Sequence, residues 1–308
     1  MKIIFYIYIN KFLFMNILVS GCNGLLGSTF KLLEKEYANV HFIFKSHDEF
    51  DITNINDIES NLNEDIDIFL NCAAYINADK GEDDETIFNV NYKAIENLAI
   101  QCKKQNILFI YFSSDYVFGG DKSTPYNETD NISPLNNYGI SKVLGEFILK
   151  NVGCSYIVFR ITWLYAEFGK SFVTTIIRLL KEHDNIYVVN DQIGTPTYTI
   201  DLVYAIMQII YQLDLSKQYN DTYHFSNEGV CSFYDFAYFI NKYYDNNIKI
   251  IPCSTDDYSK ICSYKLAKRP KYSVLDKTKI KNTFNLQIPH WSDSLQKCIN
   301  NIKNRETN

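Results

Sequence analysis

Short apolar runs alternate with longer amphipathic stretches through the first half of the chain. The runs are rich in Ile, Val and Phe, as are strands that are buried on both faces of a parallel sheet. The stretches between them space apolar residues three and four positions apart, which is the period of a helix. This alternation predicts βαβ units, with strands at Asn16–Ser20, Val40–Phe44, Ile66–Asn71, Ile107–Ser113 and Ser155–Ile161, and helices at Leu25–Tyr37, Glu85–Lys104 and Tyr138–Lys150.

The pattern is less regular after Trp163. It predicts helices at Phe172–Glu182, Thr199–Leu213 and Ser232–Tyr243, and strands at Ile186–Val189 and Tyr223–Ser226. We therefore expect an α/β fold, a Rossmann-type doubly wound parallel sheet with a smaller C-terminal substrate-binding lobe over the strand ends. Residues 15–163 are the expected dinucleotide-binding domain. Residues 164–308 are expected to form mainly the lobe, with segments that return to the Rossmann domain.

The first 14 residues, MKIIFYIYINKFLF, are apolar and need a separate interpretation. Their uninterrupted apolar runs are shorter than the roughly 20 residues that span a bilayer, and no small-residue cleavage site follows them. We expect Met15 to be the functional start and residues 1–14 to be an upstream extension outside the fold. A disordered arm and a targeting segment are the alternatives, and N-terminal sequencing of the protein from its own host would decide between them.

Composition narrows the class of protein. The 308 residues are 46% hydrophobic, which is enough for a sizeable core. A formal net charge of -6 and the lack of a concentrated Lys/Arg cluster argue against a nucleic-acid partner and favour a small molecule. The eight cysteines stand singly and the five histidines show no ligand spacing, so we expect no metal site, and reduced thiols in a cytoplasmic protein without a membrane partner.

A glycine triad lies between the first predicted strand and the first predicted helix. Gly21, Gly24 and Gly27 permit a tight turn and let the backbone approach a pyrophosphate at the helix N-terminus. The spacing is G-x-x-G-x-x-G rather than the usual dinucleotide pattern G-x-G-x-x-G, so the flanking strand and helix are needed to support the interpretation.

The end of the second predicted strand bears on the choice of cofactor. An NAD site usually has an acidic residue there for the ribose 2′-hydroxyl, whereas this chain has Lys45 and Ser46. A cation and a hydroxyl suit a 2′-phosphate, so we expect NADPH, with NADH as the alternative. Asp51 and Ile52 follow at positions where a carboxylate and a backbone amide can bind the adenine edge.

Three Tyr/Lys pairs in the chain have the spacing of one helical turn, and position singles out Tyr138 and Lys142. Tyr138 opens the helix that follows the fourth predicted strand, and Ser113 and Ser114 lie at the C-terminal edge of that strand, Ser114 24 residues before Tyr138. In open α/β sheets ligands bind beyond the carboxyl ends of the strands. The pairs that begin at Tyr238 and Tyr264 follow no such strand edge.

The three side chains suit the reduction of a carbonyl group. A free phenol has a pKa of about 10, and a nearby ammonium favours the phenolate. Lys142 shares a helix face with Tyr138, so it can supply that charge and also bind the nicotinamide ribose. Ser114 would hydrogen-bond the substrate oxygen on which charge develops.

With these motifs in place, the chain resembles the extended short-chain dehydrogenase/reductase family, and within it the dTDP-4-dehydrorhamnose reductases. The similarity runs from Asn16 to about Leu295. It rests on GCNGLLG, NCAAYINADKGEDD, NVNYKAIENLA, FSSDYVFGGDKSTPYNETDNISPLNNYGISKVLGE, FRITWLYAEFGKSFV, NDQIGTPTYTIDL, YHFSNEGVCSFYDFA and KRPKYSVLD. It implies hydride transfer from NADPH to C4 of a dTDP-linked 4-keto-6-deoxy sugar, with Tyr138 as the proton donor.

The resemblance also implies roles residue by residue. The catalytic set is Ser114, Tyr138 and Lys142. Together with Lys45, which the strand-end argument supplies, the cofactor residues are Gly21, Gly24, Leu25, Leu26, Gly27, Asp51, Ile52, Ala73, Ala74, Tyr75, Phe112 and Lys142. The substrate residues are Ser114, Asp115, Trp163 and Arg269, where Arg269 is a pyrophosphate contact or, alternatively, one half of a surface ion pair.

Some features leave other functions open. Cys72 stands where relatives usually have alanine, and Ile161 where they often have threonine, so the exact sugar is not fixed. A 4,6-dehydratase needs a second acid after Asp115, where this chain has Tyr116. A reductase or epimerase for another 4-keto sugar and a non-catalytic regulatory subunit of methionine adenosyltransferase stay open. The resemblance suggests a homodimer, sometimes linked by magnesium, but no acidic cluster is assigned to that metal.

Overall fold

The structure is a computed structural model that describes residues 14–244 and 248–307. The predicted upstream extension lies outside the described residues, apart from Phe14. The first strand begins at Met15.

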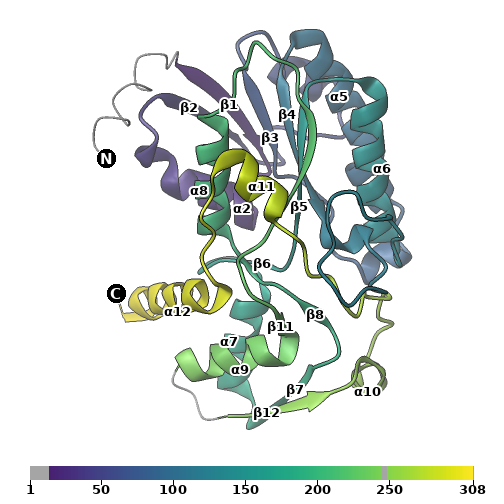
Figure 1. Cartoon of the computed structure of the whole chain (residues 1–308), viewed down its shortest axis with the longest axis vertical. Helices are drawn as coiled ribbons and strands as arrows, with labels where there is room; N and C mark the ends of the chain where they lie inside the picture. The colour runs from purple at the N-terminus through teal and green to yellow at the C-terminus, as the bar shows by residue number, and fades with distance from the viewer. Residues whose placement is uncertain (1–13, 245–247, 308) are drawn as a thin grey trace.

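A six-stranded parallel sheet forms the centre of the molecule (Figure 1). Its order is β10-β5-β4-β3-β1-β2, and every neighbouring pair runs parallel. The strands are β1 (Met15–Ser20), β2 (Val40–Lys45), β3 (Ile68–Asn71), β4 (Leu108–Ser114), β5 (Tyr156–Ile161) and β10 (Asn220–Phe225). The five strands predicted for the first half are thus confirmed, and so is the doubly wound fold. The strand order reverses between β1 and β3, where such sheets bind ligands.

Helices cover both faces of the sheet (Figure 1). One core cluster joins α2, α8 and α11 to one face, and a second joins α3, α5 and α6 to the other. The strands carry apolar side chains on both faces, which explains their continuous rather than alternating hydrophobic runs. The bounds are α2 (Leu25–Leu33), α3 (Ile55–Asn61), α4 (Thr86–Phe88), α5 (Ala94–Gln105), α6 (Asn137–Val152), α8 (Thr199–Ile210) and α11 (Thr278–Phe284). Short 3-10 turns lie at Glu34–Glu36, Lys80–Glu82 and Asp115–Val117, and a π-helical turn at Asn89–Lys93.

The lobe has its own hydrophobic core below the carboxyl edge of the sheet (Figure 1). Its elements are β6 (Leu164–Tyr165), α7 (Phe172–Glu182), β7 (Asn185–Val189), β8 (Ile193–Gly194), β9 (Thr197–Tyr198), β11 (Cys231–Ser232), α9 (Phe233–Tyr243), β12 (Lys249–Cys253), α10 (Thr255–Ile261) and α12 (Trp291–Thr307). The sequence pattern missed α3, α10, α11, α12, β12 and the two-residue strands. The signal for α12 was present, because its buried residues Trp291, Leu295, Ile299 and Ile302 keep helical spacing.

A buried polar network ties α6 to the sheet. The carboxylate of Glu146 accepts hydrogen bonds from Arg160 Nε at 2.9 Å and Nη2 at 2.7 Å, and a third from Ser113. Arg160 Nη1 lies 3.3 Å from Nε2 of His224, whose Nδ1 lies 3.0 Å from the Tyr126 carbonyl oxygen. Burial and the neighbouring guanidinium lower the His224 pKa to about 3. The ring is therefore neutral, with its proton on Nδ1, and the network joins β4, β5 and β10 to one helix.

We predict that Arg160→Met lowers the free energy of unfolding by about 3 kcal/mol, because it leaves the Glu146 carboxylate buried without its counter-ion. The double variant Glu146→Leu/Arg160→Met should recover much of that loss, since no charge then remains buried. Urea denaturation followed by circular dichroism measures both. The control is Arg178→Met, which breaks an exposed ion pair with Glu182 and should cost less than about 1 kcal/mol. Equal losses for Arg160→Met and Arg178→Met would contradict the prediction.

Candidate active site

The turn between β1 and α2 touches the backbone that follows β3. Gly21 has a φ of 63°, and a Cβ atom there would lie 2.7 Å from the backbone nitrogen of Ala73. A Cβ atom on Gly27 would lie 2.5 Å from the carbonyl oxygen of Gly21. Both distances are too short for any side chain, so these two glycines let the turn, the first residues of α2 and the end of β3 pack together.

The first turn of α2 has no side-chain cap and no acidic residue, as expected of a turn that binds an anion. Gly24 is its N-cap and offers no side-chain hydrogen bond, and no acidic residue lies in the first turn. The backbone N–H groups at Leu25 and Leu26 therefore have no partner within the helix. Beside the turn, Asn71 accepts a hydrogen bond from Ser20 Oγ at 2.8 Å, and its buried Nδ2 has no partner among the described residues. These donors fit the pyrophosphate of a dinucleotide.

The end of β2 carries a lysine beside this turn. The Lys45 carbonyl oxygen accepts a hydrogen bond from Cys22 N at 3.1 Å. Ser46 donates through its backbone N–H and its hydroxyl to Glu49, at 2.9 and 2.7 Å. These two hydrogen bonds lower the Glu49 pKa, and the Lys45 ammonium adds to the effect. Glu49 was not predicted as a site residue, although its position four residues after the strand end could have suggested it.

The predicted adenine contacts, Asp51 and Ile52, lie just beyond. Asp51 accepts hydrogen bonds from the backbone N–H and the hydroxyl of Thr53, at 2.9 and 2.7 Å. These two bonds lower the Asp51 pKa despite its partial burial. Ile52 is buried. The carboxylate is thus held in a fixed, ionised form.

Asn91 fastens the loop that begins at Ala73 and Ala74. Its Oδ1 accepts from the backbone N–H of Tyr75 at 2.9 Å, and its Nδ2 donates to the Tyr75 carbonyl at 2.8 Å and to Ser141 Oγ at 3.0 Å. The side chain is 1% exposed. Asn91 therefore sets the distance between the cofactor loop and α6, a role that the sequence analysis missed.

Ser114 and Tyr138 come together at the carboxyl end of β4. Ser114 is the last residue of that strand, and Tyr138 lies in the first turn of α6, which the Asn136 side chain caps. Burial raises the pKa of the Tyr138 phenol well above 10, and the neighbouring Ser114 hydroxyl partly opposes that shift. The phenol is therefore protonated at neutral pH.

Lys142 lies one helical turn further along α6 and is 3% exposed. Its Nζ donates to the Phe112 carbonyl oxygen at 2.9 Å and lies 4.9 Å from the centre of the Tyr111 ring. Burial lowers the Lys142 pKa to about 7, and Glu146 partly opposes that shift. The Lys142 ammonium thus contacts two residues of β4, Phe112 and Tyr111. The larger influences on the Tyr138 pKa are burial, Ser114, Asp115 and Tyr116.

Asp115 is fully enclosed beside Ser114. Its Oδ1 accepts from Ser114 Oγ at 3.0 Å and its Oδ2 from Thr162 Oγ1 at 2.9 Å, and Ser273 adds a third hydrogen bond. Burial raises the Asp115 pKa to about 6, against the lowering effect of these bonds. Because Asp115 accepts a hydrogen bond from the Ser114 hydroxyl, it orients that hydroxyl. Whether it also contacts a sugar nucleotide stays a prediction.

Trp163 and Arg269 lie on the lobe side of the site. Trp163 has a φ of 44° and its ring stacks on Phe233, with centres 3.6 Å apart. Arg269 forms an ion pair with Asp79 at 2.8 Å and a hydrogen bond to Tyr116, whose ring packs edge-on against Tyr138. In this state both side chains are engaged within the protein. Their predicted contacts with substrate stay predictions.

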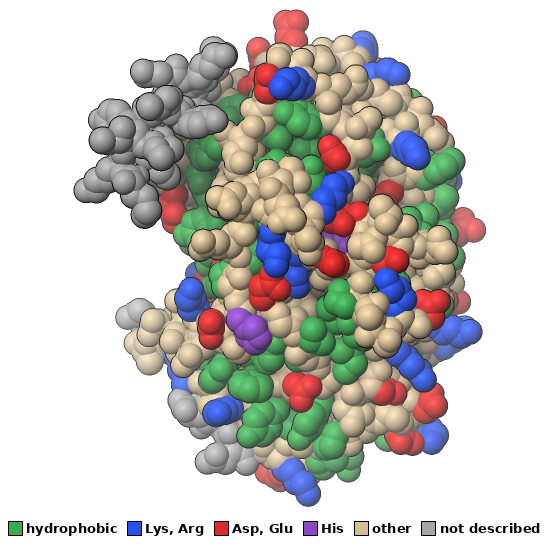
Figure 2. Space-filling model, in the orientation of Figure 1, with side chains coloured by type: hydrophobic (Ala, Val, Ile, Leu, Met, Phe, Trp, Pro, Cys, Tyr) green, Lys and Arg blue, Asp and Glu red, His purple; other side chains and the backbone are tan. Residues whose placement is uncertain are grey.

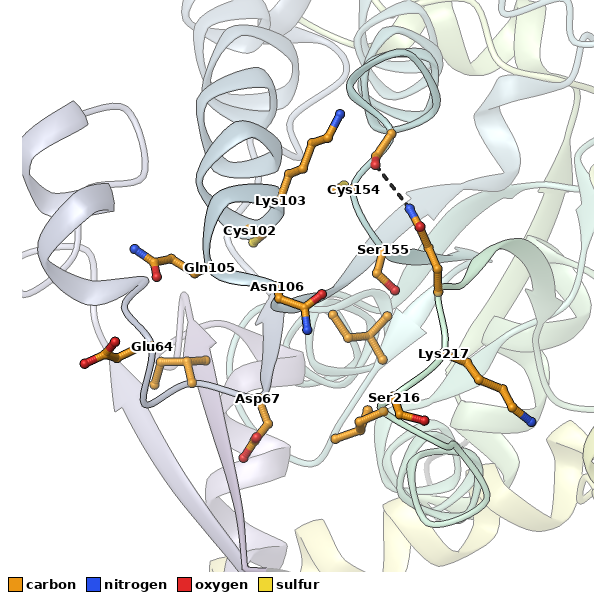
Figure 3. Close-up of a pocket in the computed structure, with 15 residues that line it drawn as sticks. Glu64, Asp67, Cys102, Lys103, Gln105, Asn106, Cys154, Ser155, Ser216 and Lys217 are labelled. Atoms are coloured by element: carbon orange, nitrogen blue, oxygen red, sulfur yellow. Dashed lines mark hydrogen bonds between the residues drawn. The ribbon is translucent and has the colours of Figure 1, made fainter.

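The hollow drawn in Figure 3 is not this site. It has a volume of about 480 Å³ and is lined by Asp67, Asn106 and Ser155, among others. These residues precede β3, β4 and β5, so the hollow lies at the amino ends of the strands. The glycine turn, Ser114 and Tyr138 lie at the opposite, carboxyl ends.

Other kinds of site find no support in the described ranges. Within residues 14–244 and 248–307, no group of three or more His, Cys, Asp or Glu side chains could hold a metal ion. No helix in those ranges is long and apolar enough to cross a bilayer. Figure 2 shows acidic and basic side chains interspersed over one face rather than gathered by sign.

Known proteins share this architecture over nearly the whole chain. A dTDP-4-dehydrorhamnose reductase from Aggregatibacter actinomycetemcomitans is 34% identical over 296 residues, which cover 93% of this chain and 98% of the relative. The crystal structure of the dTDP-4-dehydrorhamnose reductase of Bacillus anthracis in complex with NADP is 33% identical, with a TM-score of 0.85, and the match covers 94% of this chain and 100% of that one. DesIV, a dTDP-glucose 4,6-dehydratase from Streptomyces venezuelae, is 12% identical with a TM-score of 0.77 over 95% and 98% of the two chains, and so shares the fold alone.

The family model described as RmlD substrate binding domain matches residues 15–304, which is almost the entire described chain. Together with the full-length relatives at 30% identity or more, this match shows that the chain belongs to the dTDP-4-dehydrorhamnose reductase family.

Proposed function

We propose that this protein reduces the C4 ketone of dTDP-4-dehydro-6-deoxy-L-mannose (dTDP-4-dehydrorhamnose) to give dTDP-L-rhamnose, with NADPH as the reductant. The observation that carries the proposal is that Tyr138 lies beside Ser114 at the carboxyl end of β4, while the Lys142 ammonium is bound to the Phe112 carbonyl of the same strand. The membership of the chain in this reductase family supports the choice of sugar. The relative solved in complex with NADP supports the choice of cofactor.

The residues divide the work of the reaction. Bound NADPH supplies the hydride that C4 receives. Tyr138 gives its phenolic proton to the C4 oxygen, and the raised pKa keeps that proton in place at neutral pH until the oxygen gains charge. Ser114 turns its hydroxyl from Asp115 toward the same oxygen and, after the transfer, donates to the phenolate that remains. Lys142, when protonated, stabilises that phenolate and binds a ribose hydroxyl.

The substrate is tested directly by following NADPH oxidation with enzymatically prepared dTDP-4-dehydro-6-deoxy-L-mannose and identifying the product by NMR. Formation of dTDP-L-rhamnose supports the proposal. Oxidation of NADPH only in the presence of a different 4-keto sugar would identify that sugar as the substrate instead. NADPH binding without oxidation of any such sugar would favour a binding role.

Tyr138→Phe should lower kcat about 1,000-fold or more, because it removes the only proposed proton donor to the C4 oxygen. NADPH should still bind with nearly the wild-type dissociation constant, measured by fluorescence titration. The matched control is Tyr238→Phe, which alters a Tyr/Lys pair of the same spacing on α9, where the tyrosine is exposed. Residual activity above a tenth of wild type in Tyr138→Phe would remove the residue from the catalytic role.

Lys45→Ala should raise the KM for NADPH about tenfold and leave the KM for NADH nearly unchanged, because only NADPH carries the 2′-phosphate that the cation would bind. Steady-state kinetics with both cofactors give the ratio. Lys150→Ala, at the far end of α6, is the control for general loss of positive charge. An unchanged ratio would leave Glu49 and Ser46, rather than Lys45, to set the preference.

We further propose that the chain acts in the cytoplasm as a homodimer. Its eight cysteines are free thiols, as in a reducing compartment, and the dimer is the form that the family resemblance suggests. Light scattering should give twice the chain mass of 35.9 kDa. Repeating the measurement with EDTA tests whether the dimer depends on magnesium, because a metal-linked dimer would then show the mass of the monomer. A monomer without chelator would refute the dimer.

A further inference from the structure

Lys142 is a buried cation without a carboxylate partner. The described residues place no carboxylate within ion-pair distance of its Nζ, and its hydrogen bond goes to the neutral carbonyl of Phe112. The acid on its own helix face, Glu146, is held by two hydrogen bonds from Arg160. A cation in this setting needs another source of stabilisation, since burial alone disfavours its charged form.

The ring of Tyr111 lies where a counter-ion would be expected. Tyr111 belongs to β4, is 1% exposed, and has the Lys142 ammonium over its ring face at 4.9 Å from the centre. Its hydroxyl has no hydrogen-bond partner among the described residues. Gly145 on α6 makes room for it, because a Cβ atom there would collide with the Tyr111 hydroxyl oxygen. The glycine in α6 thus makes room for a ring whose hydroxyl forms no hydrogen bond within the described part of the chain.

We propose that Tyr111 is a positioning residue for the proposed reaction, whose ring face holds the Lys142 ammonium charged in place of a carboxylate. The attraction of a cation to an aromatic face strengthens when both are removed from water. An ammonium has three N–H donors. The Phe112 carbonyl takes one and the ring face attracts another, so one stays free for a cofactor hydroxyl. A carboxylate at the same point would stabilise the charge but compete for that donor.

The Lys142 pKa should change in a definite direction when Tyr111 is altered. The titratable and charged groups around it are Glu146 on its own helix, Tyr111 on β4 and, through Glu146, Arg160 on β5. Removing the ring removes an interaction made by the charged form only, so the Lys142 pKa must fall. Removing only the Tyr111 hydroxyl must leave that pKa nearly unchanged, because the hydroxyl contributes no hydrogen bond.

The test is an NMR titration of the cofactor-free protein labelled with ¹³C at the lysine ε carbon, with the Lys142 signal assigned by its loss in Lys142→Met. Tyr111→Leu should lower the Lys142 pKa by about one unit, and Tyr111→Phe should keep it within a few tenths of a unit. Equal pKa values in the wild type and Tyr111→Leu would overturn the inference. The experiment uses no sugar or cofactor, so its result stands apart from the proposed substrate.

A second measurement separates this role from simple packing. In the pH dependence of kcat/KM, the loss of rate on the alkaline side should move to lower pH in Tyr111→Leu and stay in place in Tyr111→Phe. If the titration of Tyr138 set that limb, weakening the ammonium would move it to higher pH instead, and only an unmoved limb would contradict the inference. Urea denaturation of each variant reports the packing cost, and Tyr111→Met, which fills more of the space, replaces Tyr111→Leu if that variant does not fold. Lower stability with an unmoved limb and an unmoved Lys142 pKa would leave Tyr111 a core residue only.

Discussion

The contact between the backbone of the β1–α2 turn and the backbone after β3 is the constraint on which the site depends. Gly21 and Gly27 leave no room for a Cβ atom, so the turn can press against Ala73 and the N-terminus of α2 can face the crevice between β1 and β3. The same crevice is where the strand order reverses. Fixing the turn against β3 also fixes it relative to β4, because parallel pairing links β1, β3 and β4 in one register. The glycine turn and the end of β4 that carries Ser114 are thus positioned by a single sheet.

Burial has the largest effect on the pKa values of the ionisable groups near the carboxyl end of β4. It raises the pKa values of Asp115 and Tyr138 and lowers that of Lys142. The phenol holds its proton, and the lysine loses its proton more readily than an exposed lysine does. Hydrogen bonds oppose the shift of Asp115, and Glu146 opposes that of Lys142 only in part because Arg160 occupies its carboxylate. A ketone reductase needs this division, with a proton ready on one group and a positive charge available on the other.

A short segment before Pro270 contacts α6 and the loop after β3. Asp79 accepts hydrogen bonds from the Ala267 backbone and from Arg269, both at 2.8 Å, and the capping residue Asn136 donates to the Lys268 carbonyl at 2.7 Å. The residue that caps α6 therefore also holds the lobe against it. Arg269, a predicted substrate contact, is in this way placed relative to Tyr138, although it lies more than a hundred positions away in the chain.

Much of this was determined by the sequence itself. Local hydrophobic patterns suffice for the five strands and the long helices of the first half, and glycines between a strand and a helix mark the turn, because these signals depend on neighbours in the chain. The polar helix α12, the short strands of the lobe and the roles of Asn91, Glu49 and Asp79 depend on partners that only folding supplies. The sequence placed Tyr138 and Lys142 one helical turn apart. Only the tertiary structure decided that the lysine contacts the Phe112 carbonyl of β4 and the Tyr111 ring. The reason is that the packing of α6 against the sheet determines which groups surround a buried charge.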